Sequence, residues 1–283
     1  MDNISSSHSA PTQFVDVGGR RLAYRSVGRG KPLVLCVRFR GTMDTWDPLF
    51  LDSLAEQGFR VVTFDYSGLG QSTGERTYNP AALAQDAIDL ILALDLKDVV
   101  IGGWSVGGMA AQIVLAKAPA LVSHAVLIAT TPPGPLVKPG EQLFYTLARR
   151  ENDFDDLVTV FFEPASPASR AAAEQSLKRT SERKHDLSPS VPLEWAAEQL
   201  GDRPRNPMFP ADAVLQALKS TQIPVLHLGA DHDIVFPVEN WYALNAQLPT
   251  LHLVTLPRTG HGPHLQYPQA SAKHIAAFVG VSA

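Results

Sequence analysis

Short runs of apolar residues alternate with helical patterns along most of the chain, and this alternation limits the possible folds most strongly. Nearly continuous runs rich in Val, Leu and Ile occupy residues 33–37, 60–64, 99–103, 125–129, 224–228 and 251–256. Runs of that length are typical of strands buried on both faces, as in a parallel sheet. Helical patterns follow at residues 48–57, 80–94, 106–118, 237–248 and 268–278. The order predicts an α/β fold with a mostly parallel sheet.

Two stretches depart from the alternation. Residues 1–12 are rich in serine and are predicted to form a flexible tail, and a hairpin over 14–27 follows it. Residues 135–221 carry helical patterns, many prolines and no convincing strand, so we expect a helical cap that leaves 13–134 and 222–283 as the core. Ligands of parallel sheets bind beyond the carboxyl ends of the strands, which favours a cap over a surface excursion without a role.

Charge and cysteine content exclude several classes of protein. The 283 residues include 24 Lys and Arg against 28 Asp and Glu, and this net charge of −4 argues against nucleic acid as a partner. The single cysteine, Cys36, excludes a disulfide scaffold and a thiolate metal cluster. The sequence has no apolar run of the roughly 18 residues that span a bilayer, and its first residues do not resemble a secretory signal. We expect a soluble, cytoplasmic protein that binds a small molecule and no membrane; the pattern does not indicate an oligomeric state.

The strongest chemical motif is Gly103-Trp104-Ser105-Val106-Gly107. It follows a predicted buried strand and opens a predicted helix, which is where a nucleophile elbow lies. The sharp turn of an elbow exposes the serine, and the flanking glycines let neighbouring backbone approach closely. A helix that begins beside Ser105 also directs free N–H groups at developing negative charge. Ser105 is therefore the predicted nucleophile.

A serine hydroxyl needs a base to take its proton, and histidine is the usual base. His261 lies between glycines in a loop after the last predicted strand, where it is accessible. His264 follows in the same loop and is the weaker candidate. Histidines at or inside predicted strands are expected to be packing or edge residues: His124, His227 and His252.

A carboxylate must fix the tautomer of the histidine and stabilise its charged form. Two aspartates follow the strand predicted at 224–228, Asp231 and Asp233. We favour Asp233 because it lies just before Pro237, which is predicted to begin the next helix. Asp231 would then cap a turn.

The chain order of serine, aspartate and histidine is that of the α/β-hydrolases, and the sequence resembles this superfamily over nearly its whole length outside the tail. Residues 65–72, Asp-Tyr-Ser-Gly-Leu-Gly-Gln-Ser, are similar to its D-x-R-G-x-G-x-S loop, with Ser67 in place of the arginine. Residues 229–237 resemble its acid loop, and Gly260-His261 its histidine loop. The resemblance implies an eight-stranded, mostly parallel sheet flanked by helices, a helical cap, and acyl transfer to Ser105 followed by hydrolysis.

One segment departs from the superfamily's pattern. After the third strand its members usually carry His-Gly and then the residue whose N–H forms part of the oxyanion hole. Val37 and Arg38 occupy the two positions here, and Phe39 falls at the oxyanion position. Because the hole uses backbone N–H groups, Phe39 and Val106 can still supply it. A lost donor would cost about 3 kcal/mol of transition-state stabilisation, so the departure bears on rate rather than on fold.

Trp104, Arg38 and Arg40 are the candidate substrate-binding side chains. Trp104 precedes the nucleophile and is expected to line the acyl pocket. Arg38 or Arg40 would bind a substrate carboxylate; the alternative, which we weigh more heavily, is an internal ion pair with Asp44 or Asp47. Aromatic residues of the predicted cap could face the same pocket, although most are expected to form the cap's own core: Phe144, Phe154, Phe161, Phe162, Trp195 and Phe209.

These residues predict a serine hydrolase that cleaves an ester or lactone bond of a small, largely apolar molecule. No metal or organic cofactor is expected. Carbon–carbon bond hydrolysis, perhydrolysis and thioester cleavage use the same triad and stay open. The second predicted class of protein is a receptor that keeps the triad but turns its ligand over slowly. The altered segment 37–39 favours this class. A scaffold for partner proteins has the least support, because all three triad residues are present.

Overall fold

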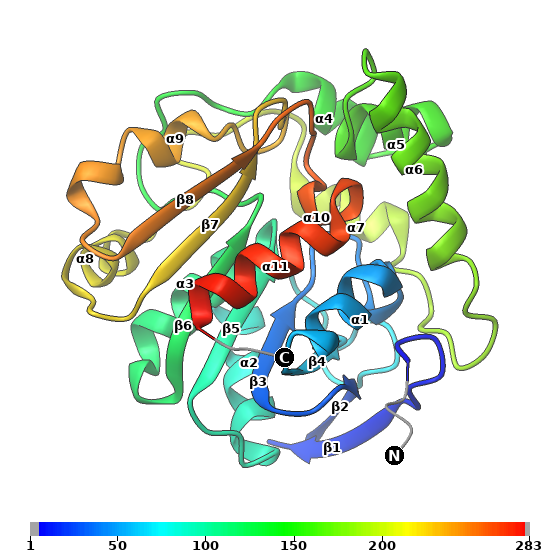
Figure 1. Cartoon of the computed structure of the whole chain (residues 1–283), viewed down its shortest axis with the longest axis vertical. Helices are drawn as coiled ribbons and strands as arrows, with labels where there is room; N and C mark the ends of the chain where they lie inside the picture. Colours follow the sequence, from blue (N-terminus) through cyan, green and yellow to red (C-terminus); the bar gives the residue numbers. More distant parts are fainter. Residues whose placement is uncertain (1–5, 281–283) are drawn as a thin grey trace.

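An eight-stranded sheet runs through the structure, a computed structural model that describes residues 6–280 (Figure 1). Its strands are β1 Gln13–Val17, β2 Arg20–Val27, β3 Lys31–Cys36, β4 Phe59–Phe64, β5 Val99–Trp104, β6 Val122–Ile128, β7 Val225–Ala230 and β8 Leu251–Leu256. Their order is β1-β2-β4-β3-β5-β6-β7-β8; β2 pairs antiparallel with β1 and β4, and all the other pairs are parallel. The predicted α/β fold with a mostly parallel sheet is confirmed.

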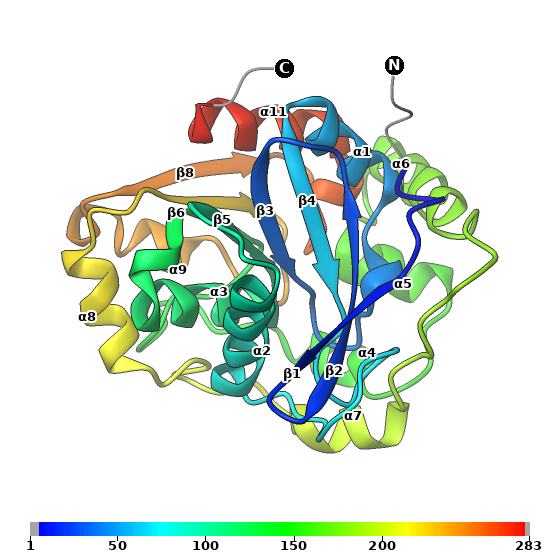
Figure 2. The same ribbon diagram turned by 90° about the horizontal axis from the view of Figure 1, so that it is seen from below.

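The central strands are mostly apolar because helices cover both faces of the sheet. Every residue of β5 and of β7 is buried. The helices are α1 Pro48–Glu56, α2 Pro80–Ala93, α3 Val106–Lys117, α4 Gln142–Ala148, α5 Phe154–Phe161, α6 Pro167–Thr180, α7 Leu193–Leu200, α8 Asp212–Ser220, α9 Glu239–Tyr242, α10 Pro263–Gln266 and α11 Pro268–Val279. Figure 2 shows α1 and α11 on one face of the sheet and α2, α3 and α8 on the other. No helix within residues 6–280 is long and apolar enough to cross a membrane.

Local sequence explains where the first helices begin. The side chain of Asp47 accepts a hydrogen bond from the N–H of Leu49 and caps α1, whose first residue is a proline. Asn79 caps α2 in the same way, again with a proline in the first turn. A proline fits there because the first N–H groups of a helix have no partner inside it.

One predicted helix is wrong in length. The pattern at 237–248 gives only the single turn of α9 and a 3₁₀ turn at Asn245–Gln247. The side chain of Asn240 donates to the carbonyl of Pro237 and so competes with regular helical bonding. Leu248 stands before Pro249, a position that disfavours helical backbone.

The predicted flexible tail also needs correction. Residues 1–5 lie outside the described residues, but residues 6–12 are docked on the body of the protein. Ala10 is fully buried, and the N–H of Ser7 donates to Asp52 at 2.7 Å. Arg183 donates to the carbonyls of Ser7, His8 and Ala10. These bonds pair the backbone with a guanidinium from a distant part of the chain, which the local composition does not reveal.

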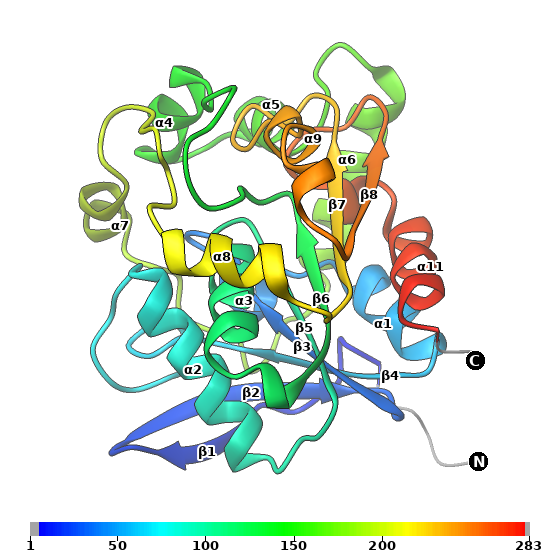
Figure 3. The ribbon, with the colours of Figure 1, turned by 90° about the vertical axis from the view of Figure 1, so that its left-hand side faces the viewer.

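The segment between β6 and β7 carries α4 to α8 and, within the described residues, no strand. Figure 3 shows α4 and α5 beyond the carboxyl ends of β7 and β8. Main-chain bonds connect α5 to the loop after β8, since His261 donates to Val160 and Gly262 donates to Phe161. The last helix, α8, packs against α3 on the face of the sheet instead. The cap predicted over residues 135–221 therefore ends too late, because it includes this helix of the core. We call residues 135–211 the insert.

Buried ion pairs hold the insert against the core. Asp47 is fully buried and accepts from Arg179 and Ser176 on α6. Asp44 pairs with Arg183 of the insert at 3.7 Å, in addition to Arg25 of β2. The insert thus has a fixed position at the carboxyl edge of the sheet.

Candidate active site

Ser105 stands in a strained turn between β5 and α3. Its backbone has φ 61° and ψ −123°, a conformation that residues other than glycine rarely adopt. The N–H of Ser105 donates to the carbonyl of Ile128 at 3.0 Å. Its own carbonyl accepts from the hydroxyl of Thr130 at 2.6 Å. Bonds to the neighbouring strand therefore hold the serine in the turn.

The two glycines of the motif are required by close packing. A Cβ at Gly103 would lie 2.1 Å from the carbonyl oxygen of Gly107. A Cβ at Gly107 would lie 2.1 Å from the carbonyl oxygen of Cys36, at the end of β3. Neither position has room for a side chain, because backbone cannot move aside as a flexible side chain can.

His261 and Asp233 lie side by side. The Nδ1 atom of His261 is 2.9 Å from Oδ2 and 3.1 Å from Oδ1 of Asp233, and both side chains are buried. The N–H groups of Val235 and Phe236 donate to Oδ1 of Asp233 at 2.8 and 3.0 Å. These bonds fix the carboxylate and leave the second ring nitrogen of His261 for another partner.

The competing candidates have other surroundings. Asp231 bonds to the exposed ring of His232 at 2.7 Å and accepts from the N–H of Thr259, as a turn-capping residue does. His264 lies in α10 with its ring centre 4.4 Å from that of Trp104. Burial holds the pKa of His264 well below its usual range. It is an uncharged packing residue.

Trp104 supports the site without lining it. The side chain is 1% exposed, and its Nε1–H donates to the carbonyl of His261 at 2.8 Å. It borders neither of the two cavities that reach Ser105. The prediction that Trp104 lines the pocket is therefore wrong, because its ring points under the histidine loop.

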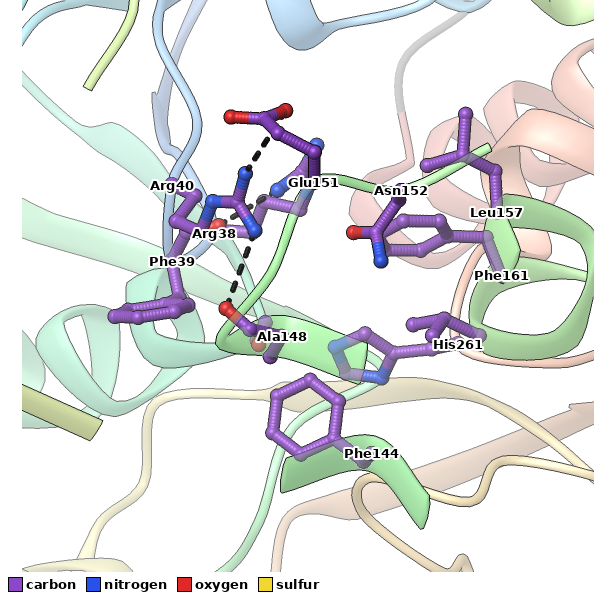
Figure 4. Close-up of a pocket in the computed structure, with 12 residues that line it drawn as sticks. Arg38, Phe39, Arg40, Phe144, Ala148, Glu151, Asn152, Leu157, Phe161 and His261 are labelled. Atoms are coloured by element: carbon purple, nitrogen blue, oxygen red, sulfur yellow. Dashed lines mark hydrogen bonds and ion pairs between the residues drawn. The ribbon is translucent and has the colours of Figure 1, made fainter. Parts of the chain in front are cut away.

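Two cavities meet at Ser105. The smaller has a volume of about 200 Å³ and also borders His261, Arg38 and Arg40 (Figure 4). The larger, of about 520 Å³, borders Val106. Phe39 and Phe144 border both cavities. Ser105 is thus open to two separate spaces.

The lining of the larger cavity is mostly apolar. Its apolar and aromatic members come from the core and from the insert and include Phe39, Tyr78, Met109, Ile113, Phe144, Leu200, Met208, Phe209, Val235 and Phe236. Arg205 supplies a charge. Of the six aromatic residues predicted for the cap, Phe144, Phe161 and Phe209 border one of the two cavities that reach Ser105. No local pattern pointed to Tyr78 or Met109, since each reaches the cavity only through the fold.

The N–H groups of Phe39 and Val106 are available at the cavity wall. Neither donates to another group within the described part of the chain. The turn that carries Phe39 is closed by a bond from Gly41 to the carbonyl of Arg38, and the N–H of Arg40 donates to the hydroxyl of Tyr78 at 2.7 Å. Arg40 takes the positive φ of 57° in this turn, whereas Arg38 does not. An arginine in place of the usual glycine therefore causes no backbone strain.

Arg38 and Arg40 both border the smaller cavity but differ in their partners. Arg40 donates to the carbonyls of Ala148 and Arg150 at 3.1 and 3.0 Å. Arg38 donates to the carbonyl of Phe39 at 2.6 Å and lies over aromatic rings. The expected ion pair with Asp44 or Asp47 is absent from residues 6–280 for either arginine, because guanidinium groups from β2 and the insert already occupy both carboxylates.

His, Cys, Asp and Glu side chains of the described residues form no group of three that could hold a metal ion. The serine, the paired histidine and aspartate, and the adjoining cavities together have the form of a hydrolase site on an α/β fold.

Comparison with known proteins identifies the family. The family model described as "alpha/beta hydrolase fold" matches residues 31–268, so the chain belongs to the α/β hydrolase family and is an enzyme of the hydrolase class. The chain is 28% identical to "Putative non-heme bromoperoxidase BpoC" of Mycobacterium tuberculosis, over 88% of its own length and 94% of that protein.

Two further matches are similar over different lengths. "Serine hydrolase BPHL" of Homo sapiens is 36% identical over 42% of this chain and 43% of that protein. The solved structure of an "Alpha/beta hydrolase fold protein from Chitinophaga pinensis" is 28% identical, with a TM-score of 0.81 over 97% of this chain and 99% of that one.

Proposed function

We propose that the protein is a serine hydrolase that cleaves an ester or lactone bond through Ser105, His261 and Asp233. The observation that carries the proposal is the elbow. Ser105 is held in a strained turn at the junction of two cavities, and His261, which borders one of them, is paired with a buried Asp233. Such an arrangement activates a hydroxyl that is otherwise a poor nucleophile.

Each residue has one role in the reaction. His261 takes the hydroxyl proton at Nε2 as the oxygen of Ser105 bonds to the substrate carbonyl carbon. The bond to the leaving oxygen then breaks, and that oxygen receives the proton from His261. Water next gives a proton to His261 and attacks the acyl-enzyme, which releases the acid and restores Ser105. Asp233 accepts the Nδ1–H and stabilises the charged imidazole.

The N–H groups of Phe39 and Val106 would hold the oxyanion. Both donors are free of other partners within residues 6–280, and both residues border the larger cavity with Ser105. Preorganised donors of this kind stabilise the charge that develops on the carbonyl oxygen.

The cavities favour a small, largely apolar substrate. The larger one falls within the range of roughly 300–1,000 Å³ typical of small-molecule sites. Phe144, Met208 and Phe209 of the insert contribute to it, so the insert acts as a cap that sets substrate size. We also propose that the protein is cytoplasmic and that its partner is a small molecule.

Hydrolysis of p-nitrophenyl esters over a series of acyl lengths tests this function. We expect turnover by the intact protein and its loss in Ser105→Ala, with a preferred acyl length that reports the cavity. Undiminished turnover in Ser105→Ala would refute the nucleophile. Tight ligand binding without turnover would favour the receptor function instead.

Perhydrolysis is the second candidate, because a relative similar over most of the chain carries the name bromoperoxidase. Hydrogen peroxide in place of water would attack the same acyl-enzyme and release a peroxy acid. Peroxy acid formed from a short-chain ester and peroxide, dependent on Ser105, would support it. Ester hydrolysis that peroxide does not divert would exclude it.

A further inference from the structure

The smaller cavity beside Ser105 is positively charged. Two guanidinium groups, those of Arg38 and Arg40, border it, and its one carboxylate is that of Glu151. Glu151 lies 4.0 Å from Arg40 with a side chain that is 85% exposed, so water screens this pair strongly. Figure 4 shows Arg38, Phe39 and Arg40 facing Asn152, Phe161 and His261 across the cavity.

Arg38 carries the unbalanced charge. Its Nη1 donates to the carbonyl of Phe39, and its buried Nε has no hydrogen-bond partner among residues 6–280. No carboxylate of the described chain lies within 4 Å of it. Burial lowers the pKa of Arg38 to about 10, which still leaves the group charged at neutral pH. A buried charge is normally paired with an opposite charge, and the described residues supply no carboxylate here.

Aromatic rings place the Arg38 guanidinium without neutralising it. Its central carbon lies 4.8 Å from the ring centre of Phe161 and 5.2 Å from that of Trp104. Cation–π contacts of this kind stabilise the charge without accepting hydrogen bonds from its N–H groups in the way a carboxylate does. Arg40 has more partners, because two main-chain carbonyls accept from its Nη1 and the carboxylate of Glu151 lies 4.0 Å away.

We propose that Arg38 binds a carboxylate of the substrate in the smaller cavity, so that the protein acts on esters that carry a negative charge near the scissile bond. A planar guanidinium matches a carboxylate through two parallel hydrogen bonds. The cavity of about 200 Å³ suits a short acidic group, and the larger cavity takes the apolar remainder. The proposal rests on the hydrolase function proposed above and specifies its substrate class.

The carboxylate can belong to either half of the ester, and two substrate pairs distinguish the cases. The acyl pair is the mono-4-nitrophenyl ester of adipic acid against 4-nitrophenyl hexanoate. The alcohol pair is 4-carboxyphenyl butanoate against phenyl butanoate. In each pair the ratio of kcat/KM for the anionic ester to that for the neutral ester is measured, after subtraction of spontaneous hydrolysis.

We expect the wild-type ratio to exceed one in one pair and to fall about 10- to 100-fold in Arg38→Gln, the loss typical of a hydrogen bond to a charged group. Arg38→Lys keeps the charge but loses the paired N–H groups of the guanidinium. Its ratio should therefore lie between those of the wild type and Arg38→Gln. Arg76→Gln is the matched control, because Arg76 also lies over an aromatic ring, that of Trp195, but borders neither cavity. Its ratio should equal that of the wild type.

The outcomes separate this proposal from the function on which it rests. Ser105-dependent hydrolysis with the same ratio in wild type and Arg38→Gln, in both pairs, would overturn the carboxylate site and keep the hydrolase. If no ester is turned over, calorimetry with glutarate decides. Binding to the wild type that Arg38→Gln abolishes supports the site, and no binding to the wild type overturns it.

Discussion

The strain at Ser105 predicts that the nucleophile position is more stable as glycine than as alanine. Both substitutions remove the hydroxyl, but only glycine adopts φ 61° and ψ −123° freely. A residue held in such a conformation costs about 1–3 kcal/mol. Glycine loses about 0.5–1 kcal/mol more than alanine in chain entropy on folding. Taking the middle of each range, we therefore expect Ser105→Gly to exceed Ser105→Ala by about 1 kcal/mol in the free energy of unfolding.

Urea denaturation of the two variants measures this difference, followed by tryptophan fluorescence and far-ultraviolet circular dichroism. Ser123 in β6 gives the matched control, because it is not among the residues with positive φ. There, Ser123→Gly should be less stable than Ser123→Ala by about 0.5–1 kcal/mol. A Ser105→Gly protein no more stable than Ser105→Ala would refute the reasoning that the fold stores strain at the elbow.

Other predictions concern the site and its supports. Asp233→Asn should lower kcat/KM by about 10³-fold or more, whereas Asp231→Asn should change it less than about threefold; equal losses would contradict the assignment of the acid. Trp104→Phe removes the bond to the buried carbonyl of His261 and should lower the free energy of unfolding by about 1–3 kcal/mol in urea denaturation; an unchanged value would contradict the supporting role. Burial lowers the pKa of His227 to about 3, so only the unfolded chain takes up this proton between pH 6.5 and 3, and stability falls as the pH drops through that window. His227→Phe should therefore flatten the stability profile between pH 6.5 and 5; a profile as steep as that of the wild type would exclude His227 as the cause.

The sheet and the elbow were predictable because their signals are local. Buried strands are continuous apolar runs, and the motif around Ser105 needs only a strand before it and a helix after it. His261 and Asp233 also follow strand ends, and parallel strands end at the same edge of a sheet. Topology therefore brings together residues that are far apart in the chain.

The partners of charged side chains were not predictable in this way. The sequence favours an ion pair of Arg38 or Arg40 with Asp44 or Asp47, but Arg179 of α6 pairs with Asp47 instead. Ser67 takes the place of the arginine in the loop pattern that residues 65–72 resemble, and the guanidinium of Arg20 lies beside it, with Nε 2.7 Å from its hydroxyl oxygen. Long side chains pair across the fold, and no periodicity in the sequence records which of many arginines meets which carboxylate.

Covalent labelling tests the central claim, that Ser105 is an activated nucleophile, most directly. A fluorophosphonate forms a bond to the oxygen of an activated serine and releases fluoride, and peptide mass spectrometry locates the adduct. We expect a single adduct on Ser105, absent in Ser105→Ala and much slower to form in His261→Gln. An unlabelled protein, or an adduct on a different residue, would contradict it.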